Sequence, residues 1–467
     1  MFGHHIMLPT LSRATFCVLL FAGLFNNAVA DTPANCTYED IRGTWIFSIG
    51  SGNNDRTVNC SKSFTPVRQS KFQLTYPDVA VDEFGNQGFW TIIYNQGFEV
   101  VVAGRKYFAF SKYVGKTSYC HETMPGWSHD VLGRDWSCYS GKKLGEAIIK
   151  EQTPAQRDNS LRFSHRVNSN EMVEAINKIQ NSWEATHYPQ FDSFSEEDFI
   201  NLAGGHSSGV HSRPKPAPLT EEHKAIMQSL PKDFDWRNVD GINYVSPVRN
   251  QGGCGSCYAF GSMGMAEARV RIQTNNTQTP VFSPQDIVEC SEYSQGCAGG
   301  FPYLIGGKYA EDFGLVLEKC NPYTGKNGKC QTDPKCPRHY FTGYRYIGGY
   351  YGGCNEALMM QAIHQNGPIA INFEVYRDLV SYKSGVYHHN PSLTANVGFN
   401  PFEITNHVVV AVGWGTVKTT GQKYWIVKNS WGDGWGLDGY FWIERGNDEC
   451  SFESLAAESF PILSTLS

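Results

Sequence analysis

The sequence lacks the charge of a nucleic-acid-binding protein. Its 39 Lys and Arg residues are outnumbered by 45 Asp and Glu residues, which gives a formal net charge of -6 and a pI near 6.2. No long run of like charge appears along the chain. Because recognition of a phosphate backbone needs a concentrated basic surface, we expect no nucleic-acid partner.

The sequence also lacks a long apolar run after residue 30. A helix needs about 20 apolar residues to cross a bilayer, so we expect no membrane span in the mature chain. The earlier run FCVLLFAGLF, residues 16–25, is too short to span and ends near Ala28-Val29-Ala30. That ending has the small-x-small pattern of a cleavage site. We therefore predict a signal peptide over residues 1–30 and a mature chain that begins at Asp31.

Cysteine is not scarce, and its count constrains the fold. Of the 14 cysteines, Cys17 lies in the predicted signal peptide, which leaves 13. Disulfides are expected on the secretory route, and an odd number means that at least one thiol stays outside an intramolecular bridge. The same route fits glycosylation at three sequons, which begin at Asn35, Asn59 and Asn275.

Composition shifts divide a chain of 467 residues, long enough for two or three folded units. Residues 36–140 alternate apolar and polar positions around Gly and Asn turns, which predicts a small antiparallel sheet or barrel. Residues 141–229 are polar with a helical pattern, and 204–219 form a Gly-, Ser- and Pro-rich linker open to proteolysis. A third unit starts at 231. In the middle segment, the apolar residues predicted on or near one helical face are Val173, Ile176, Ile179 and Trp183.

The stretch RNQGGCGSCYAF, residues 249–260, carries the strongest chemical signal. Its two cysteines, Cys254 and Cys257, are set among glycines. The residues after Cys257, YAFGSMGMAEARVRI, predict a helix, which puts this thiol at a helix N-terminus, where the helix dipole favours the thiolate. A thiolate that cleaves peptides needs a histidine to hold a proton and deliver it to the leaving amine.

Three further residues complete such a site. His407 begins the apolar strand HVVVAVGWG, 150 residues after Cys257. Asn429 ends another apolar strand, in YWIVKNSWGDGWG, and its carbonyl oxygen can hold the imidazole without adding a charge. Gln251 lies six residues before Cys257 and can donate to the oxyanion of a tetrahedral intermediate.

The cysteine pair has other interpretations. A metal clip would need a second Cys or His pair at ligand spacing, whereas His388 and His389 are adjacent, so we predict no metal site. A redox pair has the right spacing but lacks the early βαβ context. A structural disulfide explains one of the two cysteines, and we assign Cys254 to it and Cys257 to catalysis.

Several blocks of the sequence match a known pattern. Cys254-Gly255-Ser256-Cys257-Tyr258 fits the signature C-G-[SA]-C-[WY], and DWRN, CSEYSQGCAGGFP, GPIAINFEVY and KNSWGDGWG fit further blocks. The segment from about 231 to 460 thus resembles the papain family of cysteine peptidases. Asn429 lies 172 residues after Cys257, beyond the spacing of about 130 to 150 in that family, which lengthened loops would explain.

The rest of the mature chain extends the resemblance. DTPANCTYEDIRGTWIF, TIIYNQGFEV, HDVLGRDWSCY and RPKPAPLT resemble the dipeptidyl peptidase branch of that family, which carries an extra exclusion domain. The resemblance implies an α+β fold: an antiparallel β-barrel exclusion domain over 31–145, a pro-region and linker over 146–229, and a papain-like two-lobed peptidase domain over 230–467. It also implies excision of the pro-region and a cut within about 389–401 into heavy and light chains.

The same resemblance implies the reaction. The enzyme would remove dipeptides from the free N-termini of peptides and proteins through an acyl-enzyme on Cys257, and would activate the zymogens of other proteases by such trimming. The exclusion domain would wall off the cleft, and Asp31 would bind the substrate's α-ammonium. An anion at a fixed distance from Cys257 selects a charged N-terminus. The distance would then allow two residues between that N-terminus and the cleaved bond.

The resemblance also implies a site for the second residue of the substrate, formed by Phe301, Pro302 and Tyr303. A chloride ion, the cofactor that the family carries, would be bound by Phe301, Tyr303 and Tyr346. Backbone N–H and phenol O–H groups can bind such an anion. Plain core packing is the alternative role for each aromatic residue.

Further implications concern the assembly and the cysteines. The family is homotetrameric and lysosomal, and some of the protein would be secreted. Cys354 and Cys450 would remain as buried thiols beside the catalytic Cys257. The implied disulfides are Cys36–Cys120, Cys60–Cys138, Cys254–Cys297, Cys290–Cys330 and Cys320–Cys336.

Two other functions stay open from the sequence. The chain could be an ordinary endopeptidase whose N-terminal domain only aids folding, and N-terminally blocked peptides would separate the two activities. Gly43-Thr44-Trp45 before a strand-rich segment is similar to the G-x-W start of lipocalin barrels, so the N-terminal unit could bind a small ligand. Against this, Trp on a strand is more often a core residue.

Overall fold

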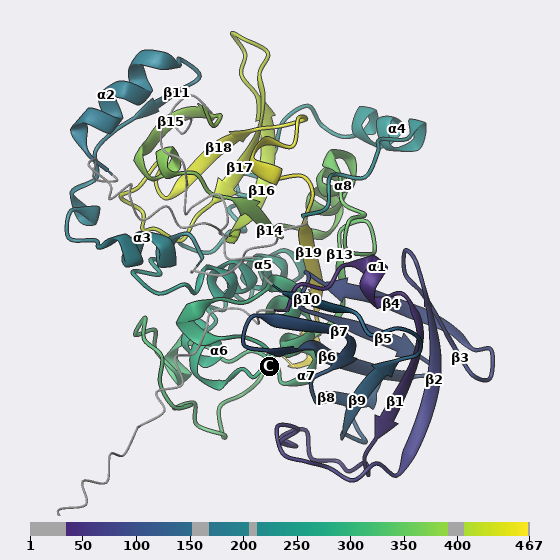
Figure 1. Cartoon of the computed structure of the whole chain (residues 1–467). Coiled ribbons are helices and arrows are strands. Elements are labelled where there is room, and N and C mark those ends of the chain that lie inside the picture. Colours follow the sequence, from purple (N-terminus) through teal and green to yellow (C-terminus); the bar gives the residue numbers. More distant parts are fainter. Residues whose placement is uncertain (1–33, 152–167, 205–212, 391–405, 466–467) are drawn as a thin grey trace, which may run out of the picture.

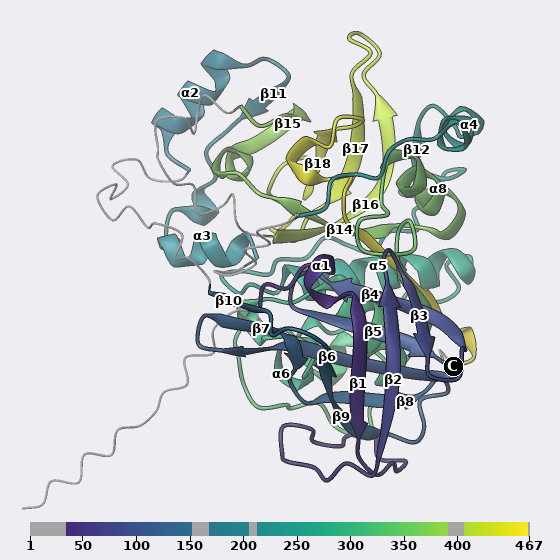
Figure 2. The same cartoon turned by 45° about the vertical axis from the view of Figure 1, so that its right-hand side comes forward.

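The computed structural model describes residues 34–151, 168–204, 213–390 and 406–465. A β-barrel lies against the lower part of a two-lobed domain, with the long helix α5 (Cys257–Gln273) near the boundary between the lobes (Figure 1). The turned view keeps the barrel beside α5 and α6 (Pro284–Cys290) and separates it from the sheet of the upper lobe (Figure 2). The predicted mixture of helices and sheets is confirmed.

The N-terminal domain is the predicted antiparallel barrel. Eight strands pair in the order β1-β2-β3-β4-β5-β6-β8-β9, and β9 pairs again with β1, which closes the ring. The short helix α1 (Tyr38–Ile41) precedes them, and β10 pairs with β7 and extends the domain to Glu151. The strands are β1 Gly43–Ile49, β2 Arg68–Thr75, β3 Val79–Asp82, β4 Gln87–Ile93, β5 Gly97–Val102, β6 Arg105–Val114, β7 Thr117–Thr123, β8 Gly126–Asp130, β9 Ser137–Lys143 and β10 Ile149–Glu151.

The interior of the barrel is filled by its own aromatic side chains. Trp45 is fully buried, its ring centroid lies 4.9 Å from that of Phe98, and its indole N–H donates to Ile41 O at 2.7 Å. Phe47 packs against Phe72 and Tyr139 with ring centroids 4.8 Å away in each case. Trp45 is therefore a core residue, as its alternation on β1 favours, and these rings occupy the space that a lipocalin-like ligand would need.

The middle segment is only partly helical. Helix α2 (Asn170–Ile179) covers the predicted pattern, with Ile176 buried, but it stops before Trp183, which instead begins strand β11 (Trp183–Ala185) on the edge of the second sheet. The prediction of Trp183 on the helical face is wrong. The helix ends because Gln180 Oε1 accepts hydrogen bonds from the backbone N–H groups of Ser182 and Trp183, both at 3.1 Å, which fixes a turn. The later helices of the segment are α3 Glu196–Leu202 and α4 Glu221–Ser229.

The C-terminal domain combines helices with a nine-stranded sheet. The strands run in the order β11-β15-β18-β17-β16-β14-β19-β13, and β12 pairs with β16. Its strands are β12 Phe234–Asp235, β13 Phe341–Tyr346, β14 Ile369–Glu374, β15 Tyr382–Tyr387, β16 Asn406–Thr416, β17 Lys423–Lys428, β18 Tyr440–Glu444 and β19 Ala456–Pro461. Its other helices include η3 Tyr303–Tyr309, α7 Ala310–Asp312 and α8 Glu356–Asn366.

Two glycines allow α5 to lie close to β16. A Cβ atom at Gly261 would stand 2.5 Å from Val408 Cγ1, and one at Gly264 would stand 3.1 Å from Val410 Cγ2. A glycine inside a helix costs about 1 kcal/mol relative to alanine, so these two residues are explained by the close contact and not by helix propensity. The contact brings the start of α5, where Cys257 lies, beside the start of β16, where His407 lies.

The disulfides of the structure are the five pairs that the resemblance implied, Cys36–Cys120, Cys60–Cys138, Cys254–Cys297, Cys290–Cys330 and Cys320–Cys336. Cys354 and Cys450 stay outside them and are buried. Burial raises the pKa of both thiols well above the ordinary value, so neither is a reactive thiolate. Within the described ranges, no helix is long and apolar enough to cross a membrane.

Candidate active site

Cys257 is the first residue of α5 and lies outside the disulfides. The loop before it is clamped by the Cys254–Cys297 bridge and by a hydrogen bond from Gly255 N to Cys297 O of 2.9 Å. A Cβ atom at Gly255 would stand 2.5 Å from Cys297 O, so only glycine fits there. The motif thus fixes the thiol at the N-terminal end of a long buried helix, where the helix dipole stabilises a thiolate.

His407 is held by the amide of Asn429. The ring nitrogen Nε2 lies 2.7 Å from Asn429 Oδ1, and the backbone N–H of Ser430 donates to the same oxygen at 2.8 Å. This contact makes Nε2 the protonated nitrogen and leaves Nδ1, which has no hydrogen-bond partner among the described residues, for proton exchange. The indole of Trp431 lies over the ring at 5.0 Å and shields the hydrogen bond from water.

Gln251 belongs to the same network. Its Oε1 accepts from Ser430 Oγ at 2.6 Å, so the amide is tied to the residue that follows Asn429. Its Nε2 donates to Cys254 O at 3.0 Å and lies 3.4 Å from Leu202 O. An amide N–H beside the thiol is the donor that a developing oxyanion needs.

The middle segment covers this site. Leu202 O, at the end of α3, also accepts from the indole N–H of Trp431 at 3.2 Å, and Gln190 donates to Trp431 O at 3.2 Å. His407 is fully buried beneath this cover, and burial lowers its pKa to about 4 although the bond to Asn429 acts in the opposite direction. The imidazole is therefore neutral in the covered form at neutral pH. Carbonyl oxygens at the end of α3 accept the amide N–H of Gln251, so this N–H is not free for an oxyanion.

The aromatic residues predicted for the substrate lie at the contact with the barrel. Phe301 and Tyr303 are 1% and 2% exposed, and Pro302 between them is buried. Phe301 stacks on Tyr94 of the barrel with ring centroids 3.7 Å apart, and Tyr303 stacks on Tyr346 at 4.3 Å. Gly300, next to Phe301, lies against Tyr258, which follows Cys257: a Cβ atom at Gly300 would stand 2.7 Å from the Tyr258 ring. The segment is therefore near the nucleophile.

Other predicted positions have mixed surroundings. Asp31 lies outside the described residues, as does most of the region 389–401 proposed for a cut. Among the sequons, Asn59 and Asn275 are exposed and Asn35 is half-buried.

The described residues include one group with metal-ligand chemistry. His388, Glu444 and Glu449 offer ligand atoms within 4.8 Å of one another. His388 Nδ1 already lies 2.7 Å from Glu449 and 3.1 Å from Glu444, while His389 pairs separately with Asp378 at 3.2 Å. The two adjacent histidine side chains therefore have different partners, and hydrogen bonds to carboxylates account for the group.

Three residues of the site were not assigned a role from the sequence. Ser430 and Trp431 lie in the block KNSWGDGWG, which predicted a role for Asn429 alone. The Trp that follows the catalytic amide was the available signal, since an indole there can shield the His407–Asn429 hydrogen bond from water. Tyr94 lies in a turn of the barrel with a φ of 51° and donates to the side chain of Asn372 on β14. No local pattern could have placed it there, because the two residues are 278 positions apart.

These features define a cysteine peptidase of the papain type. A thiol at the start of a buried helix, a histidine held by an amide on a neighbouring strand and an amide donor for the oxyanion are the parts that this chemistry requires. The comparisons agree: the family model "Papain family cysteine protease" matches residues 230–460, and the model "Cathepsin C exclusion domain" matches residues 31–143.

Individual relatives narrow the assignment. Cathepsin C of Schistosoma mansoni is 44% identical over 454 residues, which are 96% of this chain and 99% of that protein. Among solved structures, procathepsin B S9 of Trypanosoma congolense has a TM-score of 0.51 at 27% identity and covers 64% of this chain and 99% of its own. Digestive procathepsin L2 of Tenebrio molitor has a TM-score of 0.51 at 32% identity and covers 62% of this chain and 89% of its own. The chain belongs to the cathepsin C family of papain-like cysteine peptidases.

Proposed function

We propose that this peptidase removes dipeptides from free N-termini. The observation that carries the proposal is the contact of the barrel with the cleft: Tyr94 donates to Asn372 on β14, and β14 pairs with β16, where Phe373 is opposite His407. A domain seated there obstructs the extension of a substrate beyond a short N-terminal portion. Such obstruction turns an endopeptidase cleft into an exopeptidase site.

The N-terminal segment supports a role for Asp31. Cys36 N donates to Asn95 O at 2.8 Å, which ties this segment to the same barrel turn that carries Tyr94. Asp31 precedes the first described residue, Ala34, by three positions, and three extended residues reach about 10 Å. We propose that its carboxylate pairs with the α-ammonium of the substrate and sets the two-residue count.

The catalytic residues divide the reaction between them. Cys257 Sγ attacks the carbonyl carbon of the second substrate residue. His407, oriented by Asn429, accepts the thiol proton and gives it to the leaving amine as the C–N bond breaks. Gln251 Nε2 and the Cys257 backbone N–H stabilise the oxyanion. Water then hydrolyses the acyl-enzyme. The reaction requires departure of α3, since Leu202 O accepts the amide N–H of Gln251 that the oxyanion needs.

Chloride is proposed at the aromatic cluster. The Tyr346 hydroxyl is buried and has no hydrogen-bond partner among the described residues, which fits a donor waiting for an anion. The Tyr303 hydroxyl donates to Glu99 at 2.9 Å, so Tyr303, like Phe301, would contribute a backbone N–H at the start of η3. The ion would then lie at the base of the site for the second substrate residue.

Other features are proposed from the family. We infer a pro-region that is excised, a cut between heavy and light chains within about 389–401, a homotetramer, and a secretory route that ends in the lysosome or in secretion. Glycans at Asn35, Asn59 and Asn275 fit that route. Protein substrates with free N-termini would include protease zymogens.

The deciding experiment compares one dipeptidyl fluorogenic substrate with its N-acetylated twin on the processed protein. We expect cleavage of the free form alone and a loss of at least about 10³-fold in Cys257→Ser. Asp31→Ala should then weaken the preference for the free form. Equal cleavage of both twins would refute the dipeptidyl function and leave an endopeptidase.

A further inference from the structure

A carboxylate of the barrel is buried inside its contact with the peptidase domain. Glu99, on β5, is 1% exposed. Its Oε2 accepts from the Tyr303 hydroxyl at 2.9 Å, and its Oε1 accepts from the Tyr344 hydroxyl at 2.6 Å. Both carboxylate oxygens are thus bound by hydroxyls of the other domain, more than 200 residues away in the sequence.

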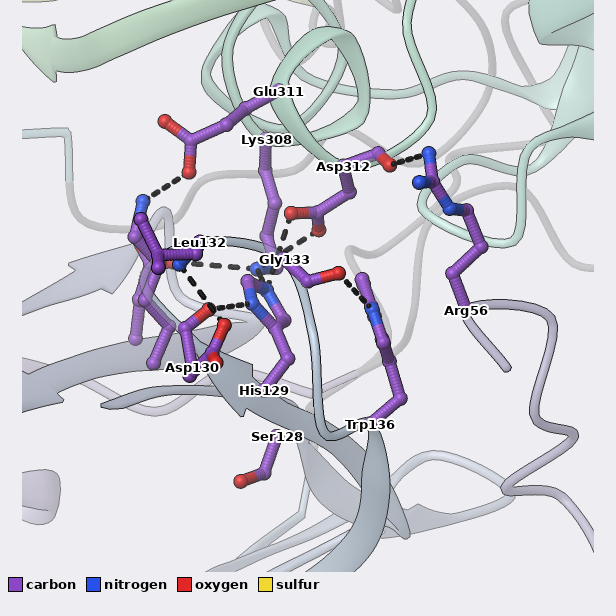
Figure 3. A network of polar contacts seen from close by, with 12 residues as sticks. Arg56, Ser128, His129, Asp130, Leu132, Gly133, Trp136, Lys308, Glu311 and Asp312 are labelled. Carbon is purple, nitrogen blue, oxygen red and sulfur yellow. Dashed lines mark hydrogen bonds and ion pairs between the residues drawn. The ribbon is translucent and has the colours of Figure 1, made fainter. Parts of the chain in front are cut away.

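The charge of Glu99 has a lysine partner within the same contact, which it shares with Asp312. Lys308 Nζ lies 3.6 Å from Glu99 Oε1 and 3.1 Å from Asp312 Oδ2, while His129 of the barrel approaches Asp312 at 3.1 Å. Figure 3 shows Lys308 extending from its helix toward His129, with Asp312 beside it. A buried carboxylate needs such a partner, and its hydrogen bonds are stronger than those of a neutral acceptor.

Tyr303 connects this charged group to the aromatic cluster. Its ring stacks on Tyr346, and it lies two residues after Phe301. Burial raises the pKa of Tyr303 well above its ordinary value, and Glu99 raises it further, so the hydroxyl stays protonated and remains a donor. Because the ring is tethered at its far end, it cannot change rotamer without breaking a buried hydrogen bond to a charged group.

We propose that Glu99 is a positioning residue for the substrate site: through it, the barrel holds Tyr303 in place behind the binding site for the second substrate residue. This inference rests on the proposed function, which assigns Phe301 and Tyr303 to that residue. The barrel then has a second task beside obstructing the cleft, since it determines which second side chains are accepted. A large side chain reaches toward Tyr303, whereas a glycine does not.

The test is Glu99→Gln in the processed full-length protein. Glutamine keeps the size of the side chain but offers one acceptor oxygen in place of two, and no charge. Two dipeptidyl fluorogenic substrates that differ only in the second residue, glycine or phenylalanine, report the effect. We expect kcat/KM for phenylalanine relative to glycine to fall at least about fivefold, mainly through KM, with kcat on the glycine substrate within about twofold.

Glu311→Gln is the matched control. Glu311 bridges the same two domains through an ion pair with Lys106, whose side chain is 14% exposed against 17% for Glu311. No hydrogen bond between Glu311 and Tyr303 is found in the part of the chain that the structure describes. This variant should therefore leave the ratio between the two substrates unchanged, although it also removes an interdomain charge.

Two results would overturn the inference: an equal loss on both substrates in Glu99→Gln, or the same ratio change in Glu311→Gln. If Glu99→Gln does not fold, Tyr303→Phe decides, because it removes only the hydroxyl that Glu99 binds. It should reproduce the ratio change, and an unchanged ratio contradicts the proposal. Failure of the dipeptidyl function appears separately, as equal cleavage of free and N-acetylated substrates by the unsubstituted protein.

Discussion

Two parts of the chain cover the peptidase domain, namely the barrel and the middle segment 168–204. These two covers are attached in different ways. The barrel is attached through fully buried charges, with Lys308 between Glu99 and Asp312, and through the stacking of Tyr94 on Phe301. The middle segment 168–204 is attached through an edge strand, backbone carbonyls and apolar side chains such as Trp183 and Phe191 that join the core of the peptidase domain. Its ion pair with that domain, between Glu184 and Lys383, has side chains that are 54% and 50% exposed.

The difference bears on which cover stays after the proposed excision of the pro-region. Removing one partner of a buried ion pair is costly because the other charge stays unpaired in the interior. An exposed pair contributes little, and its loss is compensated by water. We therefore expect the barrel to stay after the proposed excision of the pro-region, whereas loss of the exposed Glu184–Lys383 ion pair opposes departure of the middle segment only weakly. That departure would free the amide N–H of Gln251 from Leu202 O.

The largest effect is expected from Lys308→Met. The substitution keeps an unbranched side chain, one heavy atom shorter, but leaves Glu99 and Asp312 without their lysine, so we expect a loss of about 3 to 5 kcal/mol in the free energy of unfolding. The present charges hold the pKa of Asp312 well below its usual range although burial acts in the opposite direction. Denaturant unfolding at neutral pH measures the loss.

Lys383→Met is the matched control, since it breaks the exposed ion pair of the other cover. We expect a change of no more than about 1 kcal/mol. Comparable losses in the two variants would contradict the distinction between the covers.

The next largest effect is expected from lowering the pH, which should weaken the attachment of the middle segment. The pKa of His407 is lowered to about 4 in the covered form, from an ordinary value of 6.5. We expect uncovering to hydrate His407 and to return its pKa toward the ordinary value. Between the two values the uncovered form then binds more protons, so the cover is most stable above about pH 6.5 and is weakened as the pH falls toward about 4. The whole shift corresponds to about 3 kcal/mol, which is the upper bound for the effect on the cover. Protection factors of the α3 amides, measured by hydrogen exchange and corrected for intrinsic rates, should fall over this range.

His407→Gln removes the titrating group and serves as the control for the acid effect. Its α3 protection should lose most of its dependence on pH. An equal pH dependence in both proteins would assign the opening to other groups.

The smallest effect is expected at the N-terminus of α3. Ser195 Oγ accepts from Asp198 N at 3.2 Å, and Asp198 accepts in return from Ser195 N at 2.8 Å, which forms a capping box. Ser195→Ala should destabilise α3 by about 1 kcal/mol and raise its exchange rate roughly fivefold. Barrel amides should be unaffected. Unchanged α3 exchange would show that the helix is held by the cleft and not by its cap.

The sequence predicted the parts of the fold that are governed by local patterns. Alternation predicted the barrel, and the helical pattern of the residues after Cys257 predicted α5, although its two glycines are explained only by the contact with Val408 and Val410. The order of Gln251, Cys257, His407 and Asn429 predicted a site whose His407–Asn429 bond the structure contains.

The remainder depends on contacts between distant residues. Trp183 has a helical period relative to Ile176, yet the side chain of Gln180 ends the helix and Trp183 joins a sheet edge. Glu99 sits in GFEVVV as an ordinary polar position of a strand, and only the packing of two domains buries it against Tyr303. Long-range pairing of this kind leaves no periodic trace in the sequence.

The most direct test of the central claim is the composition of the processed particle. After limited proteolysis within 152–167 and 204–219 at acid pH, native mass spectrometry should find the barrel fragment bound to the peptidase domain and the fragment with α2, β11 and α3 released. A particle that keeps the α2–α3 fragment and loses the barrel would contradict the account.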